Sequence, residues 1–266
     1  MISRIIIGQY QPSDSFGHRL DPRAKILAAL FVMVVAMFTT SALFYLMIIA
    51  GIILLLLFSD ISAGTILRNG KPFIFLVLIT ALYHLLFSAR DTETVMQIFG
   101  FNLTRGGISM AASFSLRILL FVGIAFFISL TTMPAEMAET LVGWLKPLKK
   151  IGVPVNDIGL IVFIAMRFIP VLAEEMDTIR QAQLVRGVDF SGGLKKRGRN
   201  LLFLLIPVFQ SAIRRADELA IAIESRGYIS GAPRSSLKIF RFRSADWLFM
   251  SGAVVVVTIL FLIMRG

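Results

Sequence analysis

A short arginine-containing signature occurs twice in the chain, at 182–187 (AQLVRG) and at 222–227 (AIESRG). The copies share alanine, arginine and glycine at matching positions, and apolar residues at helical spacing precede each of them. Arginine presents a planar fork of N–H donors that suits a carboxylate or carbonyl partner. Neither Arg186 nor Arg226 has an acidic residue three or four positions earlier, where a helix would pair them. The chemistry that the signatures predict is therefore contact with a partner protein.

The same pattern is also typical of an ordinary helix C-terminus. Glycine is a common helix stop, and a basic residue in the last turn interacts favourably with the negative end of the helix dipole. Capping alone explains a single copy, whereas repetition favours an additional external role. Both interpretations predict helices that end at Gly187 and Gly227.

No residue pattern typical of an enzyme is present in the sequence. The chain has no cysteine and only two histidines, His18 and His84, which are far apart and disfavour a metal site. It lacks the H-E-x-x-H, G-x-S-x-G and G-x-x-x-x-G-K-[ST] motifs. Acidic residues near the signatures have basic neighbours, and we expect Glu218 to pair with Arg214 or Arg215 in solvated salt bridges. We expect no catalytic residue, no metal and no cofactor of the chain's own.

Composition identifies an integral membrane protein. The 266 residues are 57% hydrophobic and 16% charged, with a mean hydropathy of +0.83, whereas soluble domains carry about 25% charged residues. In such a chain the net charge of +11 indicates basic cytoplasmic loops rather than nucleic-acid binding. We expect an all-α membrane protein with about five transmembrane helices and a cytoplasmic coupling module of about three helices.

Apolar runs and their boundary residues place the five spans. The uncharged run 26–59 is too long for one crossing, so a turn at Thr39–Ser41 is expected. Asp21 and Pro22 are typical of an N-cap and first helical residue, and Pro72 is expected to open the third span. The spans are predicted at about 24–39, 42–58, 72–88, 107–131 and 247–264.

Two polar residues fall inside the predicted spans. Arg117 would cost about 2.5–3.5 kcal/mol near the bilayer centre, and the sequence favours a functional and a structural role equally. His84 is expected to make a polar contact between helices, because no carboxylate accompanies it in the membrane.

The region 132–245 differs in character from the rest of the chain. It holds 17 basic and 10 acidic residues, and its apolar runs, 160–166 and 201–209, are shorter than the roughly 20 residues that a crossing needs. Pro170 and Pro207 precede the signatures and are expected to act as structural hinges, bending or starting the helices. The predicted domains are the N-terminal arm with four spans at 1–131, the coupling module at 132–245 and the last span at 246–266.

Basic residues also orient the chain. Five crossings put 23 basic residues on the side of the N-terminus and three on the side of the C-terminus. The positive-inside rule then predicts that the N-terminus and 132–245 are cytoplasmic and that the C-terminus is outside.

The motifs as a set resemble a known family. The residues that carry the resemblance are Arg167-Phe-Ile-Pro170, Glu174-Glu175 and the first signature, Arg214 to Ala220 with Arg226-Gly227-Tyr228, the N-terminal DSFGHRLDPR, and Thr131-Thr132. They are similar to the transmembrane T component (EcfT/CbiQ-like) of energy-coupling factor (ECF) transporters, over nearly the whole chain. In that family two helices that end in Ala-Arg-Gly dock on two cytoplasmic ATPases. The membrane part holds a substrate-binding S component for a vitamin or a metal ion.

The resemblance implies a scaffold and coupling subunit of an ECF-type ABC importer in a bacterial or archaeal cell membrane. Such a subunit transmits ATP-driven motion to the S component, while the partner subunits bind the ATP. Val185 and Ser225 stand where the family has alanine. The residues implied to contact the ATPases are Ala182, Val185, Arg186, Gly187, Ala222, Ser225, Arg226 and Gly227.

Two alternatives belong to other classes. A conventional ABC importer permease also carries cytoplasmic coupling helices, normally in one short loop rather than in a long region with two motifs. A stand-alone secondary transporter is expected to show broken spans or charges at the membrane midplane.

Overall fold

The computed structural model describes residues 13–61, 63–87, 94–98, 101–188, 190, 193–229 and 242–265. The first twelve residues of the expected N-terminal domain and residues 230–241 of the expected coupling module lie outside this description. Contacts divide the described chain into two units. We call residues 13–133 with 242–265 the core unit, and residues 134–229 the α6–α8 unit.

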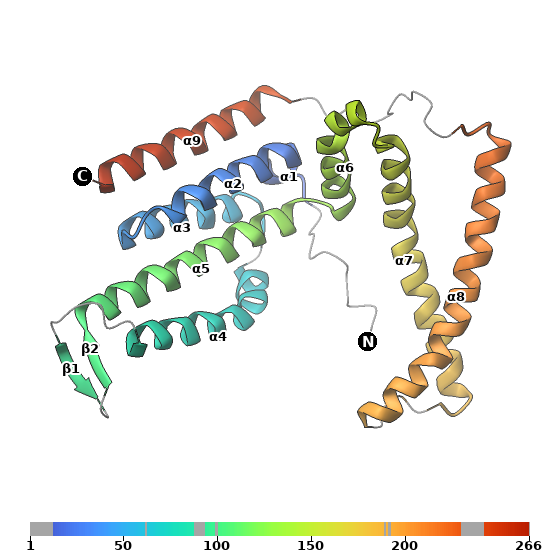
Figure 1. Ribbon diagram of the computed structural model, residues 1–266, viewed down its shortest axis with the longest axis horizontal. Helices are drawn as coiled ribbons and strands as arrows, with labels where there is room; N and C mark the ends of the chain where they lie inside the picture. Colours follow the sequence, from blue (N-terminus) through green and yellow to red (C-terminus); the bar gives the residue numbers. More distant parts are fainter. Residues whose placement is uncertain are drawn as a thin grey trace. The chain divides into compact units, whose positions relative to one another are not determined.

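Helices dominate both units (Figure 1). The core unit contains α1 (Phe16–Arg19), α2 (Pro22–Met37), α3 (Ala42–Leu57), α4 (Ala63–Phe87), α5 (Arg105–Thr131) and α9 (Ser244–Arg265). Strands β1 (Thr94–Ile98) and β2 (Phe101–Thr104) form an antiparallel pair before α5, where a polar loop is expected from the sequence. The α6–α8 unit contains α6 (Pro134–Leu145), the 3₁₀-helix η2 (Lys146–Ile151), α7 (Val155–Val185) and α8 (Leu194–Ser225). The prediction of an all-α membrane protein is confirmed.

Four described helices are long and apolar enough to cross a membrane: Gly64–Phe87, Arg105–Thr131, Val155–Val185 and Ser244–Met264. Helices α2 and α3 have 16 residues each, which gives about 24 Å per helix against a hydrocarbon core of about 30 Å. Helix α7 was not among the predicted spans. The prediction from the run 160–166 underestimated the length of this helix. Arg167 does not end the helix there but lies within one continuous helix, Val155–Val185.

Most predicted helix boundaries agree with the structure. Helix α2 ends at Met37 and α3 begins at Ala42, so the expected turn at Thr39–Ser41 is confirmed. Asp21 caps α2 by accepting a hydrogen bond from the Arg23 backbone N–H at 2.9 Å. The start predicted at Pro72 is wrong, because this proline lies inside α4. An intramembrane helix tolerates an internal proline where local adjustments satisfy the freed carbonyl group.

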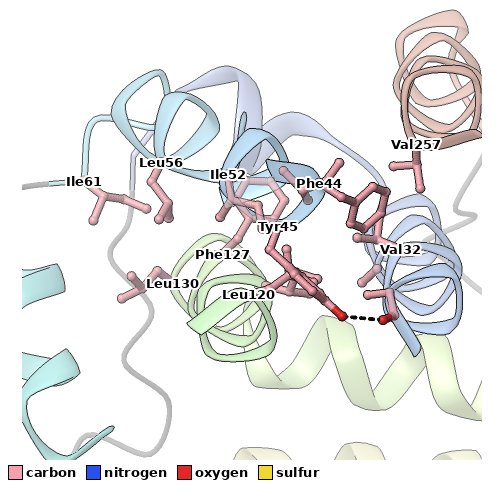
Figure 2. Packing of buried hydrophobic residues seen from close by; sticks show 14 residues of the cluster. Val32, Phe44, Tyr45, Ile52, Leu56, Ile61, Leu120, Phe127, Leu130 and Val257 are labelled. Atoms are coloured by element: carbon pink, nitrogen blue, oxygen red, sulfur yellow. Dashed lines mark hydrogen bonds between the residues drawn. The ribbon is translucent and has the colours of Figure 1, made fainter. Parts of the chain in front are cut away.

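The apolar core lies between α2, α3, α5 and α9. Figure 2 shows Tyr45 of α3 beside Leu120 of α5 and Phe44 of α3 toward Val257 of α9. The side chains of Phe44, Tyr45 and Leu120 are fully buried. The rings of Phe44 and Tyr45 meet edge to face, with their centroids 5.7 Å apart. Val257 of α9 belongs to the same buried cluster. Helix α4 packs along α5, yet its apolar stretch buries no residue within the chain, which suits a surface that faces lipid or a partner.

Candidate coupling surface

Both arginine signatures form the C-termini of long helices. Helix α7 ends at Val185 and α8 at Ser225, and Gly187 and Gly227 adopt left-handed backbone angles with φ of +85° and +72°. Glycine reaches this region without the steric cost of a Cβ atom. Both signatures therefore end their helices in the way that their sequence predicts.

The two ends share one hydrogen-bond pattern. The Gly187 N–H donates to the Leu184 carbonyl at 3.0 Å, and the Val188 N–H donates to the Gln183 carbonyl at 3.0 Å. In the second copy the donors are Gly227 and Tyr228, and the acceptors are the carbonyls of Glu224 and Ile223. This is the Schellman arrangement, which satisfies the last carbonyl groups of a helix without any side chain. The arginine side chains are consequently not needed for capping.

The signature side chains point away from the protein. Arg186 and Arg226 are exposed, and neither guanidinium makes a hydrogen bond or an ion pair with any residue that the structure describes. Val185, next to Arg186, is 90% exposed. Ala182, Ala222 and Ser225 are exposed as well, and the Ser225 hydroxyl donates to the Ala222 carbonyl. An exposed valine beside an unpaired arginine is suited to contact with another protein.

The two signatures lie at opposite ends of the α7–α8 pair. Helix α8 packs against α7 (Figure 1), and the Tyr228 hydroxyl, just beyond the second signature, donates to the Asp157 carboxylate at 2.8 Å. Asp157 lies in the first turn of α7, whereas the first signature ends that helix. From Asp157 to Arg186 a helix rises about 40 Å at about 1.5 Å per residue. The sequence alone did not reveal this tie, because its members are 71 positions apart.

An ion pair joins the middle of the two helices. Arg215 of α8 contacts Glu175 of α7 at 3.1 Å, so the expected pairing of Arg215 with Glu218 on its own helix is wrong. Arg215 pairs with Glu175 of the neighbouring helix, because the packing of α8 on α7 brings that carboxylate within reach. A hydrogen bond from Ser211 and the charges of Arg215 and Arg214 lower the pKa of Glu175, against an opposing effect of desolvation. The carboxylate is therefore held in its charged form.

The two hinge prolines lie within the helices rather than at their starts. Pro170 is inside α7 and Pro207 is inside α8, and α8 changes direction partway along its length (Figure 1). A proline in a helix interior removes one backbone hydrogen bond and favours a bend. The helices therefore do not begin at these prolines. The change of direction in α8 fits the other expectation, that a proline bends the helix.

Much of the apolar surface of the α6–α8 unit is uncovered. The run 201–209 was expected to be buried or interfacial, and within the unit most of its side chains are exposed, including Ile206 and Phe209. Ile161 and Phe163 of α7 are each 65% exposed. Exposed apolar patches of this kind mark interaction with a protein or a membrane.

The core unit holds an apolar cavity of about 430 Å³ between α2, α3, α5 and α9. Small residues of these helices, such as Ala28, Gly51 and Gly252, line the cavity, and Lys25 lines it as well. Among the described residues no group of three or more histidine, aspartate or glutamate side chains comes together as a metal site would need.

The fold and this surface define a class of protein: a multi-pass helical membrane protein with a helical unit that presents two arginine-tipped ends. Residues 13–237 match the CbiQ family model, described as cobalt transport protein. The chain is similar to the energy-coupling factor transporter transmembrane protein EcfT of several bacteria. It is 41% identical to that of Acidaminococcus fermentans over 249 residues, which cover 93% of this chain and 92% of the relative. It is 39% identical to that of Brevibacillus brevis (100% and 98% covered) and 34% identical to that of Bacillus subtilis (98% of each).

The chain therefore belongs to the EcfT/CbiQ family of transmembrane T components of ECF transporters. This membership favours the ECF prediction over the conventional permease and the stand-alone secondary transporter.

Proposed function

We propose that this chain couples two cytoplasmic ATPase subunits to a membrane-embedded S component that binds a vitamin or a metal ion. ATP is bound and hydrolysed by the partner subunits, and this chain has no catalytic residue of its own. The α6–α8 unit and the N-terminus lie in the cytoplasm, and the C-terminus lies outside. Substrate choice belongs to the S component.

The single observation that carries this proposal is the pair of arginine-tipped helix ends. Each end is capped by backbone groups alone, and neither guanidinium has a partner among the residues that the structure describes. The tie between Tyr228 and Asp157 holds the two ends about 40 Å apart. Such a spacing is suited to two separate docking sites rather than to one. Movement of the two ATPases relative to each other would then act at both ends of the same helix pair.

The exposed apolar surfaces support the other part of the proposal, contact with the S component in the membrane. Apolar residues of α7 and α8 and the unburied stretch of α4 are surfaces that a small hydrophobic S component or lipid would cover. Helix α7 reaches the length of a membrane span, but its charged half, with Glu174, Glu175 and Asp177, favours a position at the cytoplasmic surface.

Purification of the tagged chain from its native membrane tests the proposal. We expect two ATPases and a small hydrophobic protein to co-purify with the parent chain. Replacing both signature arginines (Arg186→Ala with Arg226→Ala) is expected to remove the ATPases and to leave the small hydrophobic partner bound. Truncation of one partner of a buried charged contact costs about 2–5 kcal/mol, so each single variant should weaken ATPase binding by at least about thirtyfold.

Lys150→Ala is the matched control, because it removes an exposed positive charge from η2 in the same unit. It should retain both ATPases. Recovery of the ATPases with the double arginine variant at the parent's level would refute the role assigned to the signatures.

A further inference from the structure

The two Arg-Gly ends of the α6–α8 unit are not held in the same way. The second end, at Arg226, is joined to another helix by a side chain, because the Tyr228 hydroxyl donates to the Asp157 carboxylate at 2.8 Å. At the first end, the side chains of residues 179–187 make no hydrogen bond or ion pair with another element that the structure describes. The α7–α8 pair therefore has one tied end and one untied end.

Tyr228 acts on the second end through both its backbone and its side chain. Its backbone N–H donates to the Ile223 carbonyl at 3.2 Å and closes the cap of α8. Its hydroxyl donates to a carboxylate of α7, and a hydrogen bond to an ionised group is roughly twice as strong as one between neutral groups. Arg226 precedes Tyr228 by two residues, so their Cα atoms are at most about 7 Å apart. A restraint on Tyr228 is therefore a restraint on the backbone that carries Arg226.

The part of α7 that receives this hydrogen bond is itself well fixed. Asp157 lies in the first turn of α7, where the positive end of the helix dipole favours a carboxylate. These first turns pack against α6. Val155 is buried, and a Cβ atom at Gly159 would lie only 3.0 Å from the Val142 side chain of α6. Helix α6 and the start of α7 thus form one packed block, and Tyr228 fastens the second end to it.

The first end lies far along α7 from this block. The ion pair between Glu175 and Arg215 joins the middle of the two helices, and α7 continues beyond Glu175 for about 15 Å. Leu184 and Val185, in the last turn of this part, are both exposed. The last three turns of α7 therefore project from the crossing of the helices without a side-chain tie to another described element.

We propose that Tyr228 and Asp157 are positioning residues for the second ATPase contact: they hold Arg226 on the base of α7, whereas Arg186 stands at the end of an untied lever. This inference rests on the proposed function for the identity of the partner, but its geometry lies within the α6–α8 unit. The held end presents Arg226 in one orientation, which lowers the entropic cost of docking. The untied end follows its ATPase when that subunit moves. Two signatures that are alike in sequence therefore have unequal mechanical roles.

Distances between spin labels within this unit measure the hold on each end. The chain has no cysteine, so introduced cysteines carry the only labels. One label is placed at Leu141, which is exposed on α6. The other is placed at Glu224 for the second-end distance or at Leu184 for the first-end distance, two exposed residues at matching places in the signatures.

Both label positions lie on the far side of their helix from the arginine, about 200° around it at about 100° per residue. The label therefore does not cover the surface assigned to the ATPase. The full chain is labelled in lipid nanodiscs without ATPases, and pulsed electron spin resonance records each distance distribution.

The second-end distribution is expected to be narrow in the parent and to broaden in Tyr228→Phe and in Asp157→Ala, because each change removes the hydrogen bond. Asp157→Asn keeps an acceptor oxygen and should retain the narrow distribution. The first-end distribution should be the broader of the two and should stay the same in all three variants, which a general loss of structure would not allow. Tyr83→Phe, which removes an exposed hydroxyl from α4, is the matched control and should equal the parent.

Binding of purified ATPase subunits to the full chain then tests the positioning role. Combined with Arg186→Ala, Tyr228→Phe is expected to weaken binding by a further two- to tenfold, roughly the effect of losing one hydrogen bond. Combined with Arg226→Ala, it should have no further effect, because the contact that it positions is already removed.

Two results would overturn the inference: a second-end distribution that is as broad in the parent as in the variants, or equal weakening of ATPase binding by Tyr228→Phe in both arginine backgrounds. ATPase binding that neither arginine variant changes, together with the expected distances, would support the tie and would refute the proposed function. The two proposals therefore fail in distinguishable ways.

Discussion

Arg117 of α5 donates through Nε to the Tyr45 hydroxyl of α3 at 3.0 Å. Its terminal nitrogen donates to the Thr39 carbonyl at 3.0 Å. The Tyr45 hydroxyl donates to the Ala36 carbonyl at 2.8 Å, which is the dashed line in Figure 2, and lies 2.6 Å from the Thr39 carbonyl. Ser113 donates to the Thr40 carbonyl at 2.8 Å. These contacts satisfy the carbonyl groups of the α2–α3 turn.

The position of Arg117 explains why a charged residue is tolerated within this helix. Arg117 lies about 18 Å along α5 from Arg105, the first residue of this helix. The α2–α3 turn that Arg117 contacts is therefore well inside the length of α5. Lipid offers no hydrogen bonds, and an unsatisfied carbonyl there costs several kcal/mol. The guanidinium also lies over the ring of Phe114, at 5.0 Å from its centroid. The His84 ring stacks on the same phenylalanine, with the two centroids 4.2 Å apart. Of the two roles that the sequence left open for Arg117, the structure supports the structural one.

Replacing Arg117 with leucine is expected to destabilise the protein by about 1–3 kcal/mol, because it leaves buried acceptors in the turn without their donor. Arg117→Lys keeps the charge but not the two-pronged geometry, and should fall between the leucine variant and the parent. The midpoint of thermal unfolding in a mild detergent measures both. Arg105→Leu, at the exposed start of the same helix, is the control. An unchanged midpoint for Arg117→Leu would contradict this account.

Gly17→Ala is expected to destabilise the core unit by about 1–3 kcal/mol, as overpacking of a filled site does. The added methyl group meets the Ser59 hydroxyl, which is itself held by Leu55. Combining it with Ser59→Gly should restore part of the loss, because the space is then vacated. Unfolding midpoints of the two single variants and the double variant form the test. Additive losses in the double variant would show that the two residues do not compete for space.

Gly227→Ala is expected to cost about 1–2 kcal/mol at the end of α8, because alanine is strained in the left-handed region. The same change at Gly187 should act alike on α7. Gly198→Ala is the matched control: this glycine is inside α8 with open space around it, and alanine there should stabilise the helix by about 0.5–1 kcal/mol. Hydrogen exchange reports each effect locally: in the last turn of the helix for the Gly187 and Gly227 variants, and in the first turns of α8 for Gly198→Ala. Faster exchange in Gly198→Ala than in Gly227→Ala would reverse the prediction.

The pair of Glu175 and Arg215 should contribute little stability. Both side chains are partly exposed, at 21% and 40%, so a double-mutant cycle with Glu175→Gln and Arg215→Met is expected to give a coupling energy below about 1 kcal/mol. The folded-state pKa of Glu175 is lowered, so its contribution is present above the usual glutamate pKa of 4.5 and is lost as the pH falls below it. A cycle repeated at pH 7 and at pH 4 measures this. A coupling that grows on acidification would be the contrary result.

Local signals in the sequence predicted much of this protein. Apolar runs, the Asp21-Pro22 start, the turn at Thr39–Ser41 and the two Arg-Gly stops each depend on neighbouring residues, because capping and helical periodicity act over a few positions. The misplaced start at Pro72 has the same local origin: proline is as compatible with a helix interior in the membrane as with a helix start. The family resemblance added the coupling role that the local pattern left open.

Only the tertiary structure decided which of the distant polar groups meet. Lys25 and Thr131 are 106 positions apart, and Asp21 and Asp246 are 225 apart. Within the sequence Lys25 is one more basic residue near a helix start, and Glu218 is the nearer acid for Arg215. Packing of helices against each other brings other partners closer, since burial rewards only those polar groups that find a hydrogen bond. The sequence by itself determined where most of the helices begin or end and which residues stand at the two Arg-Gly ends. The packing of the helices decided which charged groups join them.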